Sequence, residues 1–234
     1  MGGLDCFLDG FNLIRKPGLR QYFIVPTIIN IFVLVCLFAV SVVYFDAWVE
    51  IVMGWFPEWM TNLYWLVWLI AFVVVLVLIL FCFTFVANII SSPFNALLSV
   101  KVEESLTGKP PVSSASLGMV LPRAVGRELS KLFYVLPRLV GLIIIPIIPV
   151  VNSVSPFLCV LFGAWMMAVQ YADYGADNND LTFGELRALL GRRRFQSIMF
   201  GLPAYLLLTV PLVNLILMPV GVAGGTRFWV EQLK

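Results

Sequence analysis

The sequence predicts an all-α integral membrane protein with two long transmembrane helices, two re-entrant helical hairpins that cross half of the bilayer, and amphipathic and cytoplasmic helical extensions. Its 234 residues are 61% hydrophobic and 12% charged, with a mean hydropathy of +0.99, whereas soluble domains carry about 25% charged residues. The hydrophobic residues gather in four long runs without charge. Proline and asparagine interrupt the last two runs near their midpoints, where a helix has to break.

The N-terminal segment, residues 1–20, is predicted to contain a helix that lies in the membrane interface. Apolar residues recur there at helical spacing: Leu4, Phe7, Leu8 and Phe11. Asp5, Asp9 and Asn12 fall on the opposite side of such a helix. We therefore expect an amphipathic anchor ahead of the first membrane crossing.

Two charge-free stretches are long enough to cross a bilayer completely. Residues 21–45 and 63–91 each exceed the about 20 apolar residues that a hydrocarbon core of ~30 Å requires. The predicted periplasmic loop at 46–62 contains acids and no Lys or Arg. Basic residues precede the first crossing and follow the second, so the positive-inside rule places both outer ends in the cytoplasm.

Two further uncharged runs, residues 139–172 and 195–226, predict the re-entrant hairpins. The related motifs PVVNSVSP at 149–156 and PLVNLILMP at 211–219 divide them. Each side of a break keeps about 10 to 17 residues, or roughly 15 to 25 Å of helix, which is too short for a full crossing. Hairpins also leave every Lys and Arg on one side of the membrane. Four complete crossings are the alternative, because proline is more frequent in transmembrane helices than in soluble ones.

The remaining segments are expected to form a cytoplasmic layer. The region 92–138 begins with a continuation of the second crossing helix to residue 106. It then carries a basic face at i, i+4 and i+8, with one acid beside it: Arg123, Arg127, Lys131 and Glu128. Residues 173–194 predict a loop and a short helix that starts with the capping-box spacing of Thr182 and Glu185. Residues 227–234 form a C-terminal tail.

The residue inventory argues against an enzyme, a metal centre and a bound cofactor. The chain has no histidine, which removes the commonest metal ligand and the usual general base near neutral pH. Its four cysteines form no C-x-x-C pair, and no G-x-x-x-x-G-K-[ST] motif for nucleotide phosphates occurs. The acids of DYGADNND at 173–180 have the spacing of a hydrogen-bonded turn. We expect no catalytic residue, metal, cofactor or nucleic-acid partner.

An anion site is predicted where the first crossing begins. Pro17 and Gly18 turn the chain, and the helix that follows would present free N–H groups of Gly18, Leu19 and Arg20. The helix dipole and the Arg20 guanidinium favour a tetrahedral oxyanion, and Gly18 lets it approach the backbone. On the residues alone, the alternative is that the basic residues of RKPGLR only orient the chain and contact lipid head groups.

Five motifs resemble the CysZ family of bacterial sulfate permeases, in order over nearly the whole chain. They are KPGLRQYFIVPTIIN, ANIISSPFNALL, ELSKLFYVLPRLV, AWMMAVQYADYGADNN and VPLVNLILMPVGVAGGTRFWV. The resemblance implies a homo-oligomeric inner-membrane protein that takes up sulfate for cysteine biosynthesis, with oxyanions such as sulfite as further candidates. It also implies sulfate binding at Gly18, Leu19 and Arg20. Many members carry a basic residue next, whereas this chain has Gln21, which can still donate a hydrogen bond.

The route of the anion must be wet and polar, because a bare ion in a medium of low dielectric costs about tens of kcal/mol. One chain offers too few polar side chains to surround a pathway, which predicts an oligomer. The accessory or pore-lining candidates are Gln21, Asn30, Asn88, Asn95, Glu103, Arg123, Arg127, Glu128 and Lys131. Without a nucleotide-binding motif, transport would be channel-like or linked to an ion gradient. The alternative function is a non-conducting membrane scaffold that binds anionic lipid through its basic cytoplasmic face.

Overall fold

The computed structural model describes the chain apart from residues 56, 58–62, 112–116, 149–151, 209 and 211–212, and all regular structure in the described residues is helical. This confirms the all-α class. The chain divides into two compact units: residues 24–94 form the smaller one, and residues 1–23 with 95–234 form the larger one. Four described segments are long and apolar enough to cross a membrane: Gln21–Met53, Tyr64–Thr107, Gly126–Ile147 and Asn152–Asn178.

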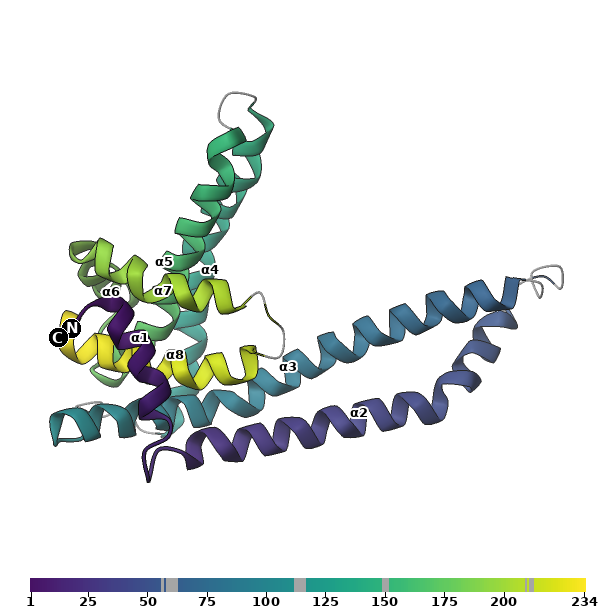
Figure 1. Cartoon of the computed structure of the whole chain (residues 1–234), viewed down its shortest axis with the longest axis horizontal. Helices are drawn as coiled ribbons and strands as arrows, with labels where there is room; N and C mark the ends of the chain where they lie inside the picture. Colours follow the sequence, from purple (N-terminus) through teal and green to yellow (C-terminus); the bar gives the residue numbers. More distant parts are fainter. Residues whose placement is uncertain (56, 58–62, 112–116, 149–151, 209, 211–212) are drawn as a thin grey trace. The chain divides into compact units, whose positions relative to one another are not determined.

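The smaller unit is built from a pair of long helices, α2 (Gln21–Met53) and α3 (Tyr64–Thr107), which run side by side in Figure 1. Within the smaller unit, aromatic rings of α2 and α3 contact each other. The ring of Phe45 meets that of Trp68 edge-on, with 5.1 Å between the ring centres.

Both long helices extend beyond the predicted crossings. α2 passes residue 45 and ends at Met53, because an acid such as Asp46 marks the edge of the apolar run without breaking the helical hydrogen bonds of the backbone. α3 passes residue 91 and ends at Thr107. The predicted continuation of the second crossing helix is therefore confirmed.

The larger unit packs four helices around one core: α1 (Gly3–Leu13), α5 (Ser155–Asn178), α7 (Arg194–Leu208) and α8 (Asn214–Phe228). α1 lies beside α7 and α8 (Figure 1). The ring of Phe200 stacks on that of Phe228 at 5.2 Å and meets that of Phe7 edge-on at 5.9 Å. The unit also contains α6 (Phe183–Arg192), a π-helical turn (Trp229–Leu233), α4 (Leu117–Ile144) and the end of α3.

α1 packs against the protein through one side and leaves apolar residues on another. Phe7 is buried inside the protein, whereas Leu4 and Leu8 are 43% and 51% exposed, and the interfacial anchor stays a prediction. The buried side of α1 instead carries small residues, including Gly3, Cys6 and Gly10. Small side chains let helix backbones approach closely, so α1 packs on α7 and α8 through this side.

The contact between α5 and α7 is equally close at Gly201. A Cβ atom placed on Gly201 would lie 1.8 Å from the carbonyl oxygen of Ala164 on α5. Carbon and oxygen atoms cannot approach to that distance without overlap, so only glycine fits between these helices.

The first hairpin consists of α4 (Leu117–Ile144) and α5, and it breaks where the sequence predicts. Short 3-10 turns at Ile145–Ile147 and Asn152–Val154 replace the helix there, and Pro156 opens α5. The predicted arm lengths of 10 to 17 residues are wrong, because the helices contain 28 and 24 residues. Both helices continue past the uncharged run into segments with charged residues. Charged side chains on one arm of the hairpin pair with charged side chains on the other, which stabilises these extensions.

The second hairpin consists of α7 and α8, which contain 15 residues each. This agrees with the predicted arm length and corresponds to about 22 Å of helix. The motif at 211–219 predicted a break that extends to Pro219. In the structure α8 already begins at Asn214, and Pro219 lies inside it. Residues 209, 211 and 212 lie outside the described chain.

The two ends of the chain contact each other in the larger unit (Figure 1). The amino nitrogen of Met1 lies 3.8 Å from a carboxylate oxygen of Glu231, and the side-chain amide of Gln232 donates to the Met1 carbonyl at 2.7 Å. Arg227 on α8 also pairs with Asp9 on α1. Polar contacts thus tie the first helix to the end of the chain.

Candidate functional site

A tight turn at residues 16–20 joins α1 to α2. The carbonyl oxygen of Lys16 accepts hydrogen bonds from the N–H groups of Leu19 at 3.1 Å and Arg20 at 3.2 Å. Gly18 has a φ of +87°, in the left-handed region that favours glycine. Leu19 is 5% exposed and packs into the core, whereas Arg20 is exposed. The turn therefore anchors Leu19 inside the protein and presents the Arg20 guanidinium outside.

The amide donors of this turn differ from the predicted set. The N–H groups of Leu19 and Arg20 are not free, because both bond the Lys16 carbonyl. In the described part of the chain, the N–H groups of Gly18 and Gln21 make no hydrogen bond to the protein. Both lie at the start of α2, where the helix dipole is positive.

A shallow cavity of about 250 Å³ opens beside the turn. Its lining residues are Lys16, Pro17, Gly18, Leu19, Lys101, Glu104 and Ser105. The ammonium nitrogen of Lys101 lies 2.8 Å from the Glu104 carboxylate. Neither residue is predicted for the site, because both come from α3, far along the chain. The cavity thus combines two ammonium groups with one acid.

A second polar cluster lies between α4 and α5. The Arg127 guanidinium pairs with Asp173, and the Lys131 ammonium lies 2.8 Å from an Asp173 oxygen. Lys131 also contacts Glu128 at 2.8 Å and the side-chain oxygen of Gln170 at 3.2 Å. Arg127, Lys131 and Asp173 are 9%, 7% and 5% exposed. These charges are almost withdrawn from solvent, which is tolerable only because they are paired.

Arg127 and Lys131 therefore do not form the exposed basic face expected from their spacing. With Asp177, which lies 3.3 Å from Arg127, the described cluster contains more acids than bases. The side chain of Arg123 on α4 lies outside the described residues. In the described chain, no three Cys, Asp or Glu side chains are grouped so that they could hold a metal ion.

The sequence alone assigns Asp173 to a turn and misses it as the partner of two buried cations. A signal for this pairing exists. Lys131 and Asp173 lie at equal distances along the chain from Asn152, where the hairpin turns, and so do Arg127 and Asp177. Antiparallel arms place such symmetric positions opposite each other.

Glu103 and Asn95 lie inside the larger unit, on α3. The Glu103 side chain is fully buried, and its carboxylate accepts hydrogen bonds from Asn179 at 2.8 Å and from the Lys234 ammonium at 3.0 Å. Asn95 is also buried and lies 3.6 Å from the sulfur of Met218. Both residues hold helices together in this structure.

Asn30 belongs to the smaller unit. It is 3% exposed, and its amide nitrogen donates to the Ser91 hydroxyl at 3.0 Å, which joins α2 to α3. Its amide oxygen is buried and has no hydrogen-bond partner among the described residues. The side chain of Asn88 lies outside the described residues.

Known proteins resemble this chain over most of its length. A family model described as sulfate transporter CysZ/etoposide-induced protein 2.4 matches residues 6–219. A protein named sulfate transporter CysZ from Pseudomonas aeruginosa strain LESB58 is 44% identical over 235 residues, covering 99% of this chain and 96% of the relative. Proteins of the same name from Pseudomonas paraeruginosa strain PA7 and Pseudomonas syringae pathovar tomato strain DC3000 are 45% and 43% identical, covering 99% and 98% of this chain and 96% and 92% of theirs.

Proposed function

Because the chain belongs to the sulfate transporter CysZ/etoposide-induced protein 2.4 family, we propose that it carries sulfate across the bacterial inner membrane and supplies cysteine biosynthesis. It is a transport protein rather than an enzyme. The observation that carries the proposal is 44% identity to a named sulfate transporter across 99% of the chain. The route is nucleotide-independent and channel-like, and it is completed by an assembly of identical chains.

Sulfate is captured at the turn that opens α2. The free amides of Gly18 and Gln21, the Arg20 guanidinium and the dipole of α2 all favour an anion. The ammonium groups of Lys16 and Lys101 add positive charge to the neighbouring cavity. Glu104 already binds Lys101, so an entering sulfate competes with this carboxylate for the ammonium group.

In the bilayer, α2 and α3 cross completely, while the two hairpins enter and return from the cytoplasmic side. The helices α7 and α8 are too short to cross a core of ~30 Å. α4 is longer, but from Lys131 to its end at Ile144 it spans only about 20 Å. The paired charges at Lys131 and Asp173 then lie near the membrane surface.

The buried ion pairs between α4 and α5 control passage at that level. A sulfate that reaches Arg127 or Lys131 has to replace the carboxylate of Asp173, so these cations bind it weakly enough for release. Because Asp173 competes with sulfate for these cations, sulfate binds weakly. Weak binding suits a channel-like route, since a conducting site must release its ion.

Uptake of radiolabelled sulfate into proteoliposomes tests the function. The protein should admit sulfate without nucleotide, and Arg20→Ala should reduce uptake by about tenfold to a hundredfold, the range expected for a lost charged hydrogen bond. Arg15→Ala is the matched control, because Arg15 is also an exposed arginine but precedes the turn at residues 16–20.

The same assay separates transport from the scaffold alternative. No uptake by correctly folded protein would favour a non-conducting scaffold. If Arg20→Ala takes up sulfate like the unmodified protein, the transport function stands but the proposed capture site is wrong. Equal losses in Arg15→Ala and Arg20→Ala would indicate that general positive charge at the membrane, and not the turn, attracts sulfate.

A further inference from the structure

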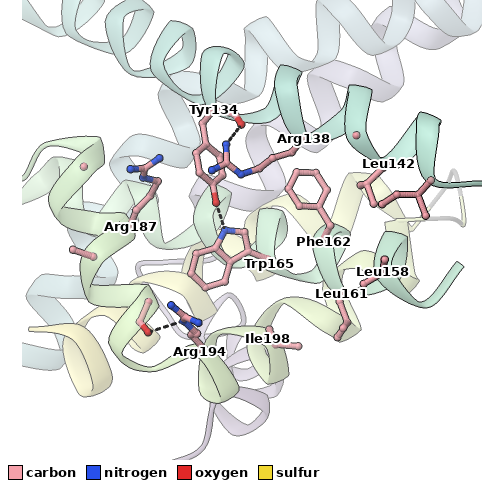
Figure 2. A pocket seen from close by; sticks show the side chains of 15 residues that line it. Tyr134, Arg138, Leu142, Leu158, Leu161, Phe162, Trp165, Arg187, Arg194 and Ile198 are labelled. Atoms are coloured by element: carbon pink, nitrogen blue, oxygen red, sulfur yellow. Dashed lines mark hydrogen bonds between the residues drawn. The ribbon is translucent and has the colours of Figure 1, made fainter. Parts of the chain in front are cut away.

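A cavity of about 780 Å³ lies against the first hairpin in the larger unit, away from the turn at 16–20. Arg138 on α4, Arg187 on α6 and Arg194 on α7 line it (Figure 2). Its lining contains no Asp or Glu. None of the three guanidinium groups forms an ion pair within the described residues, in contrast to the neutralised cluster around Asp173.

Two of these cations share one aromatic ring. The guanidinium carbons of Arg138 and Arg187 lie 3.7 Å and 4.6 Å from the ring centre of Tyr134. Contact with the ring stabilises each cation, but it does not remove the repulsion between two like charges that contact the same ring. An anion bound beside the ring would offset this repulsion.

The cavity also keeps unused hydrogen-bond donors. Arg187 makes no hydrogen bond within the described chain, and its buried Nε has no acceptor. The Nε of Arg194 donates to the Gly191 carbonyl at 3.2 Å, so the two terminal nitrogens of its guanidinium can still donate to a ligand. The Tyr134 hydroxyl accepts from the Trp165 indole N–H at 3.0 Å and retains its own proton to donate (Figure 2).

The rest of the wall is apolar. Aliphatic and aromatic side chains line it: Leu142, Ile145, Leu158, Leu161, Phe162 and Ile198. Leu142 and Leu158 lie on the side away from Arg187 (Figure 2). An inorganic anion would leave this surface unused, whereas a molecule with an anionic head and a hydrocarbon tail would cover both parts.

We propose that this cavity is a binding site for an anionic glycerophospholipid. Its phosphodiester contacts Arg138, Arg187, Arg194 and the Tyr134 hydroxyl, since guanidinium groups match phosphate oxygens in shape and charge. An acyl chain lies along the apolar wall formed by α4 and α5. The site is independent of sulfate capture at the turn.

Titration of the purified full-length protein in detergent with dioleoylphosphatidylglycerol tests the proposal. Native mass spectrometry should show a retained lipid, and the Tm should rise with its concentration. Arg187→Gln should weaken the apparent affinity by about tenfold to a hundredfold. Arg192→Gln is the matched control on the same helix, because Arg192 does not line the cavity. Arg194→Gln, at an exposed side chain, repeats the test should Arg187→Gln fail to fold.

Three comparison ligands test whether the site requires both the anionic head group and the hydrocarbon tail. Dioleoylphosphatidylcholine should bind more weakly, and equal binding would overturn a site for anionic lipid. Glycerol 1-phosphate and inorganic sulfate should not raise the Tm at matched concentrations. Equal protection by either soluble anion would show that the cavity recognises an oxyanion without a tail, which also overturns the proposal. An Arg187→Gln protein that binds phosphatidylglycerol like the unmodified protein would do the same.

Discussion

The two units of the chain bury their side chains to different extents. In the larger unit, the rings of Phe7, Phe200 and Trp229 are almost completely inaccessible. In the smaller unit, large apolar side chains such as Phe32 and Phe81 are 67% and 71% exposed. The larger unit is therefore held together by its own contacts, whereas the pair formed by α2 and α3 depends on lipid or another copy of the chain to cover it.

Both units also contain buried polar groups. In the larger unit, Asp173 pairs with the buried Arg127 and Lys131, whereas the buried Nε of Arg187 has no partner among the described residues. In the smaller unit, the buried amide oxygen of Asn30 has no partner among the described residues. An unpaired amide is costly in lipid, so we expect this oxygen to meet water or a neighbouring copy in the assembled protein.

Removing the carboxylate of Asp173 should have the largest effect. Asp173→Ala leaves Arg127 and Lys131 buried without their shared partner, which should cost about 3–5 kcal/mol and lower the Tm by roughly 10 °C. Thermal unfolding of the purified protein measures this. Glu128→Gln is the control, because the Glu128 side chain is 64% exposed and its loss should change stability by about 0.5 kcal/mol or less. Equal stability of Asp173→Ala and the unmodified protein would contradict the buried cluster.

Gly201→Ala should come next, since it forces a methyl group against the Ala164 carbonyl and separates α5 from α7. Overpacking of this kind costs about 1–3 kcal/mol. Gly126→Ala provides the comparison, because a Cβ at Gly126 meets no atom within 4 Å. The same unfolding assay should show a lower Tm for the first variant alone. A normal Tm for Gly201→Ala would show that these helices are not closely packed there.

A smaller effect is expected at the start of α6, where the predicted capping box is confirmed. Thr182 and Glu185 exchange hydrogen bonds there, and Thr182→Ala should cost about 1 kcal/mol. The bonds from Thr182 lower the pKa of Glu185 below its ordinary value of 4.5. The part of the cap that depends on the ionised Glu185 carboxylate therefore stabilises the protein above that value and is lost as pH falls through the lowered pKa. Stability measured against pH should show a smaller difference between Thr182→Ala and the unmodified protein in acid than at neutral pH, and a constant difference would exclude this coupling.

The smallest change is expected in the smaller unit. Asn30→Leu removes its hydrogen bond to Ser91 and should alter the free energy of unfolding by only about 0.6 kcal/mol, the average for hydrogen bonds between membrane helices. Ser91→Ala removes the same bond from the other side and should match it. A loss as large as that of Asp173→Ala would mean that the smaller unit also depends on internal polar contacts.

Local signals in the sequence predict much of the fold. The charge-free runs identify α2 and α3, and proline with asparagine locates the break between α4 and α5. The spacing of Thr182 and Glu185 identifies the start of α6. Each of these signals acts within a few turns of chain, where backbone hydrogen bonding and propensity decide the conformation.

Packing between distant segments is the part that local patterns do not predict. α1 has two plausible buried sides, and only contact with α7 and α8 selects the one with Gly3 and Gly10. The basic spacing of Arg127 and Lys131 indicates one helical face, but the acid that buries this face comes from α5. At the turn before α2, the sequence indicates Gly18 and Arg20, whereas only the fold brings Lys101 to the cavity beside Gly18.

The contact between Met1 and Gln232 limits the topologies that a membrane permits. Two ends within hydrogen-bonding distance belong in one aqueous compartment, so we expect the chain to traverse the bilayer an even number of times. Reporter domains fused to either end should therefore report the same side of the membrane, and opposite sides would contradict this contact.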